Sequence, residues 1–199
     1  MLISSKISKG INGIIKIPGD KSISHRSIII PSISNGVSEI FNLLMSDDVM
    51  HTLIAFKDMG VKIDILSDRI VIFGKGLQSL KKPKNSIYLG NSGTSARLLT
   101  GLLASQNFDS NLTGDNSLSS RPMKRIIKPL EEMGATIEST SGTLPVKILG
   151  QKLQNINYEI KIPSAQIKSG ILLAALNTNG KTIINEKNIT RDHTEIMLK

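Results

Sequence analysis

The sequence predicts an α/β protein that repeats one unit with the order strand, helix, strand, helix, strand, strand. Its composition favours this class, because 39% of the residues are hydrophobic, only 3% are aromatic and there is no Trp. The core must therefore consist of Ile, Leu, Val and Met, which suit helices packed on sheets better than an aromatic-rich β-sandwich. Two internal repeats complete the prediction, since both combine helical and strand patterns at matching positions.

The first repeat relates residues 46–60 to residues 120–134, which lie 74 positions later. Each copy opens with polar residues typical of a helix N-terminus and closes on a glycine, Gly60 or Gly134, that can adopt a left-handed conformation. Apolar residues recur between them at helical spacing: Leu53, Phe56 and Met59, then Ile127, Leu130 and Met133. Strand-like segments follow at residues 61–65 and 135–138. We therefore expect two related helices, each followed by a strand.

A second helical pattern occurs three times, over residues 22–33, 93–104 and 165–176, and a strand pattern at 86–89 precedes its middle copy. Together the repeats make up two full units and the start of a third, which breaks off within a capped helix at 191–199. A domain that ends within a helix leaves an apolar face uncovered. We therefore expect the chain to be a fragment of a longer protein.

The sequence lacks the residues that several classes of protein require. There is no Cys, and His25, His51 and His193 match no zinc spacing, so we expect no metal site. No apolar run reaches the roughly 20 residues of a membrane span, and the N-terminus lacks a signal-peptide pattern. The net charge of +9 favours anionic partners but is spread along the chain, unlike a nucleic-acid-binding stripe. We expect a cytoplasmic protein that binds neither nucleic acid nor membrane.

Polar turns precede the three helices of the second pattern, at residues 18–20, 90–92 and 163–164. The first N–H groups of a helix have no partner within it, and the helix dipole adds positive charge at the same end. Such ends favour phosphate or carboxylate. If the units pack around a pseudo-threefold axis, the three ends converge on one basin.

Basic side chains accompany these turns. Lys21 stands at the mouth of the first helix, and Arg26 lies on the same face as Ser22, a combination that suits a multiply anionic ligand. Arg121, at the start of a helix over 120–133, would oppose the helix dipole, which suggests a ligand anion nearby. Helix capping and solvated basic residues are the plainer interpretation of each feature.

Five segments together resemble, in order and spacing, successive signatures of the EPSP synthase (3-phosphoshikimate 1-carboxyvinyltransferase) family. They are residues 18–26 (PGDKSISHR), 89–94 (LGNSGT), 121–123 (RPM), 163–169 (PSAQIKS) and 190–195 (TRDHTE). The resemblance extends over residues 14–199, and the forms of the first, fourth and fifth segments are similar to the bacterial class II subgroup.

This resemblance implies transfer of the enolpyruvyl group of phosphoenolpyruvate to shikimate 3-phosphate, in the branch that leads to chorismate and the aromatic amino acids. It implies no metal or organic cofactor and a monomeric full-length enzyme. The family fold has two lobes, each of three βαβαββ units around a pseudo-threefold axis. Residues 14–199 would form one enolpyruvyl transferase-like lobe, with two full units and a truncated third. Residues 1–13 would form a strand segment of the other lobe.

The resemblance also assigns site residues. Lys21 would contact both substrates and is the one catalytic residue expected in this chain. The expected contacts of shikimate 3-phosphate are Lys21, Ser22, Arg26, Ser164, Ala165, Gln166 and Arg191. The expected contacts of phosphoenolpyruvate are Lys21, Asn91, Gly93, Arg121 and Gln166.

The acid–base Asp and Glu of the family would lie in the other lobe, beyond Lys199, so we expect no turnover by this chain alone. The acids near the predicted site, Asp47, Asp48 and Glu195, are explained by helix capping. Two alternatives stay open. The sister family that transfers enolpyruvate to UDP-N-acetylglucosamine shares the fold, but it carries a loop Cys and a Lys-Asn pair where this chain has Lys21-Ser22. The other is a non-catalytic anion-binding lobe.

Overall fold

The computed structural model describes residues 4, 6, 10 and 12–199. The first unit contains α1 (Lys21–Ile33), β1 (Asn35–Phe41), α2 (Asp47–Asp58), β2 (Lys62–Ile65) and β3 (Arg69–Lys75), followed by the 3-10 turn η1 (Leu77–Ser79). The second contains β4 (Ile87–Tyr88), α3 (Gly93–Ala104), β5 (Ser110–Thr113), α4 (Asn116–Ser119), α5 (Lys124–Glu132), β6 (Thr136–Ser139) and β7 (Val146–Leu149). The third contains β8 (Asn157–Ile160), α6 (Ala165–Ala175), β9 (Ile183–Glu186) and α7 (His193–Met197).

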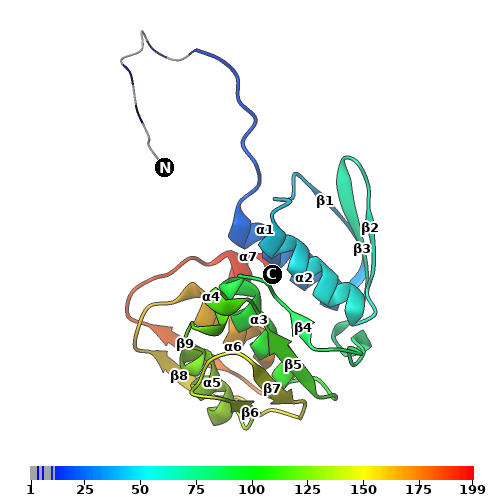
Figure 1. Cartoon of the computed structure of the whole chain (residues 1–199). Coiled ribbons are helices and arrows are strands. Elements are labelled where there is room, and N and C mark those ends of the chain that lie inside the picture. Colours follow the sequence, from blue (N-terminus) through cyan, green and yellow to red (C-terminus); the bar gives the residue numbers. More distant parts are fainter. Residues whose placement is uncertain (1–3, 5, 7–9, 11) are drawn as a thin grey trace.

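Each unit has its own sheet, with strand orders β1-β3-β2, β4-β5-β7-β6 and β8-β9. In the second and third units, the strands on either side of the first helix pair in parallel, β4 with β5 and β8 with β9. The later strands pair antiparallel. Figure 1 shows the three sheets toward the outside, around helices α1, α3 and α6. The second unit therefore confirms the predicted order βαβαββ.

The first unit differs from the expectation of a full copy. No strand precedes α1 within the described residues, and residues 12–17 run away from the body of the molecule in Figure 1. Ile14, Ile15 and Ile17 are exposed there. A strand forms only where another backbone completes its hydrogen bonds, and β1 pairs with β3 alone. The strand expected over residues 1–13 falls largely outside the described residues.

The helix ends follow the predicted glycine pattern. Gly60 and Gly134 have φ values of 87° and 94° after α2 and α5, which confirms the left-handed caps. The start of the helix expected over 120–133 is different. Residues 116–119 form the short α4, and α5 begins only at Lys124. The Met123 N–H donates to Gly142 O at 2.8 Å, so Arg121 lies in a turn before the helix.

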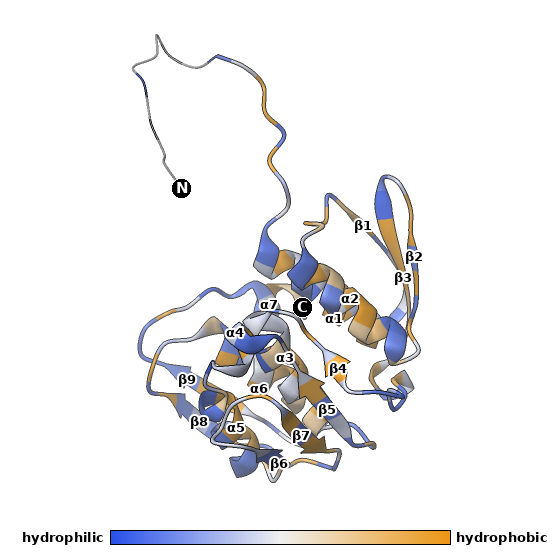
Figure 2. Ribbon diagram, viewed as in Figure 1, coloured by the Kyte–Doolittle hydropathy of each residue, from blue (hydrophilic) through white to orange (hydrophobic). Residues whose placement is uncertain are grey.

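Helix α3 lies at the centre of the hydrophobic core, and most of its residues are buried. Leu98, Leu99, Leu102 and Leu103 are wholly buried, and strands β5 and β7, which contact this helix, contain orange, apolar residues in Figure 2. Helices α3 and α6 lie in close contact at Gly101, where an added Cβ would lie 2.0 Å from Gly170 O. This contact holds the two helices, and therefore their N-terminal ends, in one arrangement.

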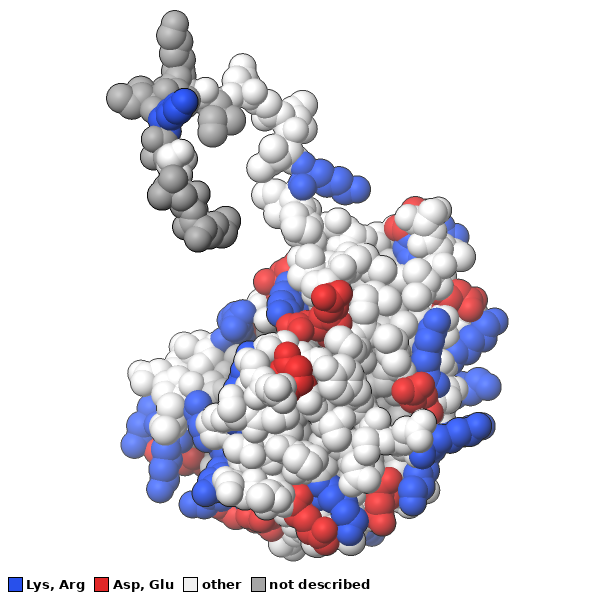
Figure 3. All heavy atoms as spheres, in the orientation of Figure 1, with Lys and Arg blue, Asp and Glu red and all other residues white. Residues whose placement is uncertain are grey.

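The surface shows how the charge is distributed. On the face in Figure 3, the Lys and Arg side chains are scattered along the edges rather than gathered into one stripe. None of the helices in the described part of the chain has both the length and the apolar character needed to cross a bilayer.

Candidate functional site

Three helices begin at one hollow. The basic hollow, of about 450 Å³, is lined by Lys21, Asp48, Asn91, Gly93, Thr94, Arg97, Arg121, Arg125, Ser164 and Gln166. These residues include the starts of α1, α3 and α6, so the predicted convergence of the three helix N-termini is confirmed. The positive ends of three helix dipoles therefore face the same space, which suits an anionic ligand.

Each of the three helix starts has a polar cap. Asp20 Oδ1 accepts the N–H of Ile23 at 2.8 Å, and Ser92 Oγ accepts that of Ser95 at 3.2 Å. Ser164 Oγ accepts the N–H of Ile167 at 3.4 Å. Each cap accepts one of the free N–H groups in the first turn of its helix, and it orients the preceding loop toward the basic hollow.

Three arginines line the hollow without a carboxylate partner. Arg97 donates to Gly93 O and Pro122 O at 2.9 and 3.0 Å, and Arg125 donates to Ile162 O at 2.8 Å. Among the described residues, neither these two nor Arg121 forms a salt bridge. Burial, reinforced by repulsion from Arg121 and Arg125, lowers the pKa of Arg97. The hollow therefore carries positive charge that an anion would neutralise.

Asn91 is held between Asp115 and Arg121. Its Nδ2 donates to Asp115 Oδ2 at 2.8 Å, and its Oδ1 accepts from Arg121 Nη2. Asp115 also accepts the N–H of Leu118 at 2.7 Å. That backbone bond, followed by the Asn91 amide, lowers the pKa of Asp115. Asp115 thus orients the Asn91 amide, and through it the Arg121 guanidinium.

Lys21 and Asp48 form an ion pair at the rim of the hollow. Asp48 lies in the first turn of α2, where helix capping alone was expected. The Lys21 side chain is half exposed, whereas Asp48 is mostly covered. The ammonium group of Lys21 is therefore held in place yet accessible to a ligand.

Two further residues shape the hollow from α3 and α6. A Cβ added at Gly93 would lie 2.8 Å from Arg97 Nη1 and 3.3 Å from Arg121 Nη1, so glycine leaves room for both guanidinium groups. Gln166 Nε2 donates to Thr94 Oγ1 at 3.0 Å. Gln166 thereby connects the first turns of the two helices.

The remaining predicted residues lie beside and beneath the hollow. Arg191 Nη1 donates to Ser22 Oγ at 3.2 Å, so these two are brought together. Ala165 is the first residue of α6, between Ser164 and Gln166. Arg26 was expected to contact the ligand, but it is only 3% exposed. Its guanidinium donates instead to protein oxygens: Thr194 Oγ1 at 2.6 Å, Ser169 Oγ at 2.7 Å and Ser22 O at 2.9 Å.

A buried hydroxyl cluster supports the helix starts. His25 Nδ1 lies 2.8 Å from Thr52 Oγ1 and 3.2 Å from Ser95 Oγ, and Nε2 lies 3.5 Å from Ser92 Oγ. Burial and then the charge of Lys21 lower the pKa of His25 to about 4. The imidazole is therefore neutral at pH 7, and it joins α1, α2 and α3 through hydrogen bonds.

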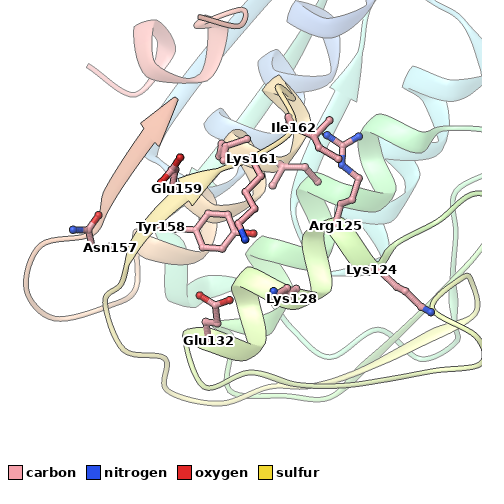
Figure 4. Close-up of a pocket in the computed structure, with 11 residues that line it drawn as sticks. Lys124, Arg125, Lys128, Glu132, Asn157, Tyr158, Glu159, Lys161 and Ile162 are labelled. Carbon is pink, nitrogen blue, oxygen red and sulfur yellow. The ribbon is translucent and has the colours of Figure 1, made fainter. Parts of the chain in front are cut away.

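A second hollow, of about 430 Å³, opens between α5 and β8 and shares Arg125 with the basic hollow. Figure 4 shows Tyr158 pointing into it, with Lys128, Lys161 and Glu132 around the ring. Its remaining lining residues are Lys124, Asn157, Glu159, Ile160, Ile162 and Ile167. Its wall contains both signs of charge and much apolar surface, so it is less suited to a small, highly charged anion than the basic hollow.

Sequence reasoning missed five residues as parts of the site: Asp48, Thr94, Arg97, Arg125 and Asp115. The position of Asp115 in the sequence could have identified it as a site residue. It follows β5, which pairs in parallel with β4, and the carboxyl ends of parallel strands meet at one edge. In the part of the chain that the structure describes, no group of three His, Asp or Glu residues could hold a metal ion.

Comparison with known proteins identifies the family. The family model "EPSP synthase (3-phosphoshikimate 1-carboxyvinyltransferase)" matches residues 5–199. The 3-phosphoshikimate 1-carboxyvinyltransferase of Ruthia magnifica is 55% identical over 195 residues, which are 98% of this chain and 45% of that protein. The corresponding protein of Vesicomyosocius okutanii is 56% identical over 193 residues, 96% of this chain and 44% of that protein.

A solved EPSP synthase from Acinetobacter baumannii has a closely similar fold. It superposes with a TM-score of 0.90 at 51% identity, over 94% of this chain and 43% of that structure. The chain thus spans a little under half the length of the relatives it matches.

Proposed function

This chain belongs to the EPSP synthase family, and from that membership we propose that the whole protein transfers the enolpyruvyl group of phosphoenolpyruvate to shikimate 3-phosphate and releases phosphate. The product, 5-enolpyruvylshikimate 3-phosphate, would serve chorismate and aromatic amino-acid biosynthesis. The family resemblance also carries the proposals that the whole protein is monomeric and cytoplasmic.

One observation carries the proposal for this chain: three arginines without carboxylate partners line a hollow at which three helices begin. Both proposed substrates bear a phosphate and a carboxylate, and such groups favour guanidinium forks and helix N-termini. The positive charge of the hollow is therefore complementary to these anionic ligands, independently of the family to which the chain belongs.

The proposed residue roles divide the hollow between the two substrates. Asn91, Gly93 and Arg121 would receive phosphoenolpyruvate, with Gln166 beside them. Ser164, Ala165 and Arg191 would receive the phosphate of shikimate 3-phosphate, and Ser22 would lie at its ring. Lys21 would contact both substrates, since its ammonium group can exchange Asp48 for a ligand anion. Arg26 would support Ser22 and Thr194 from beneath the hollow, through the hydrogen bonds that it donates to both.

We propose that this chain binds and orients the substrates. The proton transfers would rely on carboxylates in the part of the related proteins that this chain does not cover. Enolpyruvyl transfer needs a proton donor and a proton acceptor at the reacting carbon and hydroxyl. The acid that lines the basic hollow, Asp48, is paired with Lys21. The 199-residue chain is therefore expected to bind substrate without multiple turnover.

Titration calorimetry with the 199-residue chain tests this function. We expect shikimate 3-phosphate to bind more tightly than inorganic phosphate, and Arg121→Ala to weaken phosphoenolpyruvate binding measured at saturating shikimate 3-phosphate. The same titration with UDP-N-acetylglucosamine separates the sister family. Binding of that sugar nucleotide in place of shikimate 3-phosphate would overturn the proposal. Equal affinity for shikimate 3-phosphate and inorganic phosphate would overturn it as well.

A further inference from the structure

A buried lysine near the site is bound by two carboxylates. Lys168, in the first turn of α6, has a side chain only 7% exposed. Its Nζ lies 2.6 Å from Glu186 Oε2 at the end of β9 and 2.6 Å from Glu195 Oε1 in α7. Hydrogen bonds to these carboxylates more than offset the desolvation that lowers the pKa of Lys168, so that its pKa is raised. Lys168 therefore joins three elements of the third unit as a charged group.

The segment between the two glutamates is tied down at both ends. Glu186 Oε1 accepts from Thr190 Oγ1 at 2.5 Å. Thr194 Oγ1 donates to Ser169 Oγ at 2.7 Å and accepts from Arg26 Nε at 2.6 Å. Glu195 Oε2 is buried without a hydrogen-bond partner, so Lys168 is the cation on which this carboxylate depends. Residues 186–195 are thus fastened to α6 and α1.

Arg191 lies within this fastened segment, between Thr190 and Thr194. Its Nη1 reaches Ser22 Oγ at 3.2 Å, while the rest of the side chain is exposed. Arg191 has no carboxylate partner of its own among the described residues. The contacts of Lys168 with Glu186 and Glu195, together with the hydrogen bonds of Thr194, hold the backbone on either side of Arg191.

We propose that Lys168 is a positioning residue, which holds residues 186–195 against α6 and thereby places Arg191 at the anion site. This inference rests on the proposed function, in which Arg191 receives the phosphate of shikimate 3-phosphate. The physical basis is charge balance. Without Lys168, two largely covered carboxylates face each other, and a buried charge that loses its partner is strongly destabilising. Residues 187–195 then move outward, and Arg191 moves with them.

The decisive variant is Lys168→Met, which keeps much of the side-chain volume and removes the charge. Lys187→Met is the matched control, because Lys187 pairs with Glu159 at 2.9 Å in the same segment but its side chain is 79% exposed. We expect Lys168→Met to weaken shikimate 3-phosphate binding about tenfold, the scale of a lost charge-assisted hydrogen bond. The control is expected to bind like the unaltered chain.

A double-mutant cycle with Arg191→Ala separates positioning from general damage. If Lys168 acts through Arg191, the double variant binds no more weakly than Arg191→Ala alone. Lys168→Arg, whose guanidinium can still bridge both carboxylates, is expected to restore most of the affinity. Additive losses in the cycle, or unaltered binding by Lys168→Met, would overturn the inference.

Hydrogen exchange makes the inference testable even without ligand. Lys168→Met is expected to raise amide exchange across residues 187–197 and to leave α3 unchanged, whereas Lys187→Met leaves both unchanged. If the unaltered chain fails to bind shikimate 3-phosphate, the proposed function of this chain fails. In that case hydrogen exchange still tests whether Lys168 positions the segment. Amide exchange over residues 187–197 that is the same in Lys168→Met and in the unaltered chain refutes this role.

Discussion

At the scale of single residues, buried His25 makes the stability of the chain depend on pH. Its pKa is lowered to about 4 from 6.5 by burial and then by Lys21. In the unfolded chain the imidazole takes up a proton below pH 6.5, whereas in the folded chain it stays neutral until pH approaches 4. The stabilisation is therefore complete above pH 6.5 and is lost as the pH falls through this window, to a limit of about 3 kcal/mol.

We expect the free energy of unfolding to fall by about 2 kcal/mol between pH 7.5 and pH 5 through His25 alone. Urea denaturation at both pH values measures it. His25→Gln keeps a polar group among Thr52 and Ser95 but cannot titrate, so its curve should be flatter over the same interval. Parallel curves for the two proteins would contradict the assignment of the step to His25.

Asp115 acts on the hollow through Asn91. Replacing it by Asn removes the charged acceptor that fixes the Asn91 amide, and Arg121 loses its orientation in turn. We expect Asp115→Asn to weaken phosphoenolpyruvate binding at saturating shikimate 3-phosphate about tenfold, as for the loss of one charge-assisted hydrogen bond. Calorimetry measures it.

Asp109→Asn is the matched control for this change, because Asp109 accepts the N–H of Gly150 at the surface, away from the hollow. It is expected to leave phosphoenolpyruvate binding unaltered. Equal effects of the two substitutions would show that Asp115 has no specific role in orienting Asn91.

At the scale of elements, the crossing of α3 and α6 sets the geometry of the basic hollow. A Cβ at Gly101 would lie 2.0 Å from Gly170 O, a backbone atom that cannot move without its helix. We expect Gly101→Ala to lower the free energy of unfolding by about 2 kcal/mol, the scale of an overpacked core. Chemical denaturation measures it.

Gly13→Ala provides the comparison, since nothing lies within 4 Å of a Cβ added there. It should leave the unfolding midpoint unchanged. If Gly101→Ala were as stable as this control, the close approach of the two helices would not be needed for the fold.

The bounds of the helices show how accurately the sequence patterns predict secondary structure. Helix α3 occupies residues 93–104 as predicted, because its cap and its apolar spacing are local features. The helix predicted from residue 120 begins at Lys124, because the Met123 N–H is taken by Gly142 in a distant turn. Local patterns therefore locate a helix well but place its ends poorly where tertiary hydrogen bonds compete.

At the scale of the whole molecule, the net charge of +9 and the unpaired arginines of the hollow predict binding that depends on salt. Raising the ionic strength from about 0.05 M to about 0.5 M shortens the screening length severalfold. We expect the affinity for shikimate 3-phosphate to fall at least about fivefold over this range, since partly exposed charges attract the ligand.

Calorimetry at the two salt concentrations checks this prediction, and circular dichroism confirms that the chain stays folded in both. Uncharged shikimate analogues lacking the phosphate and the carboxylate serve as the control and should show little dependence on salt. Affinity for shikimate 3-phosphate that is independent of salt would mean that the hollow does not bind its ligand through these charges.

The sequence by itself determined the repeated unit, most helices, the polar turns at three helix starts and, through five ordered segments, the family. These features are encoded by periodicity, capping residues and glycines within a few positions of each other. Only the tertiary structure decided that Asp48 pairs with Lys21, that Asp115 orients Asn91, and that Lys168 lies between Glu186 and Glu195. These partners are 18 to 27 residues apart. Their pairing depends on burial and charge balance, which no local pattern carries.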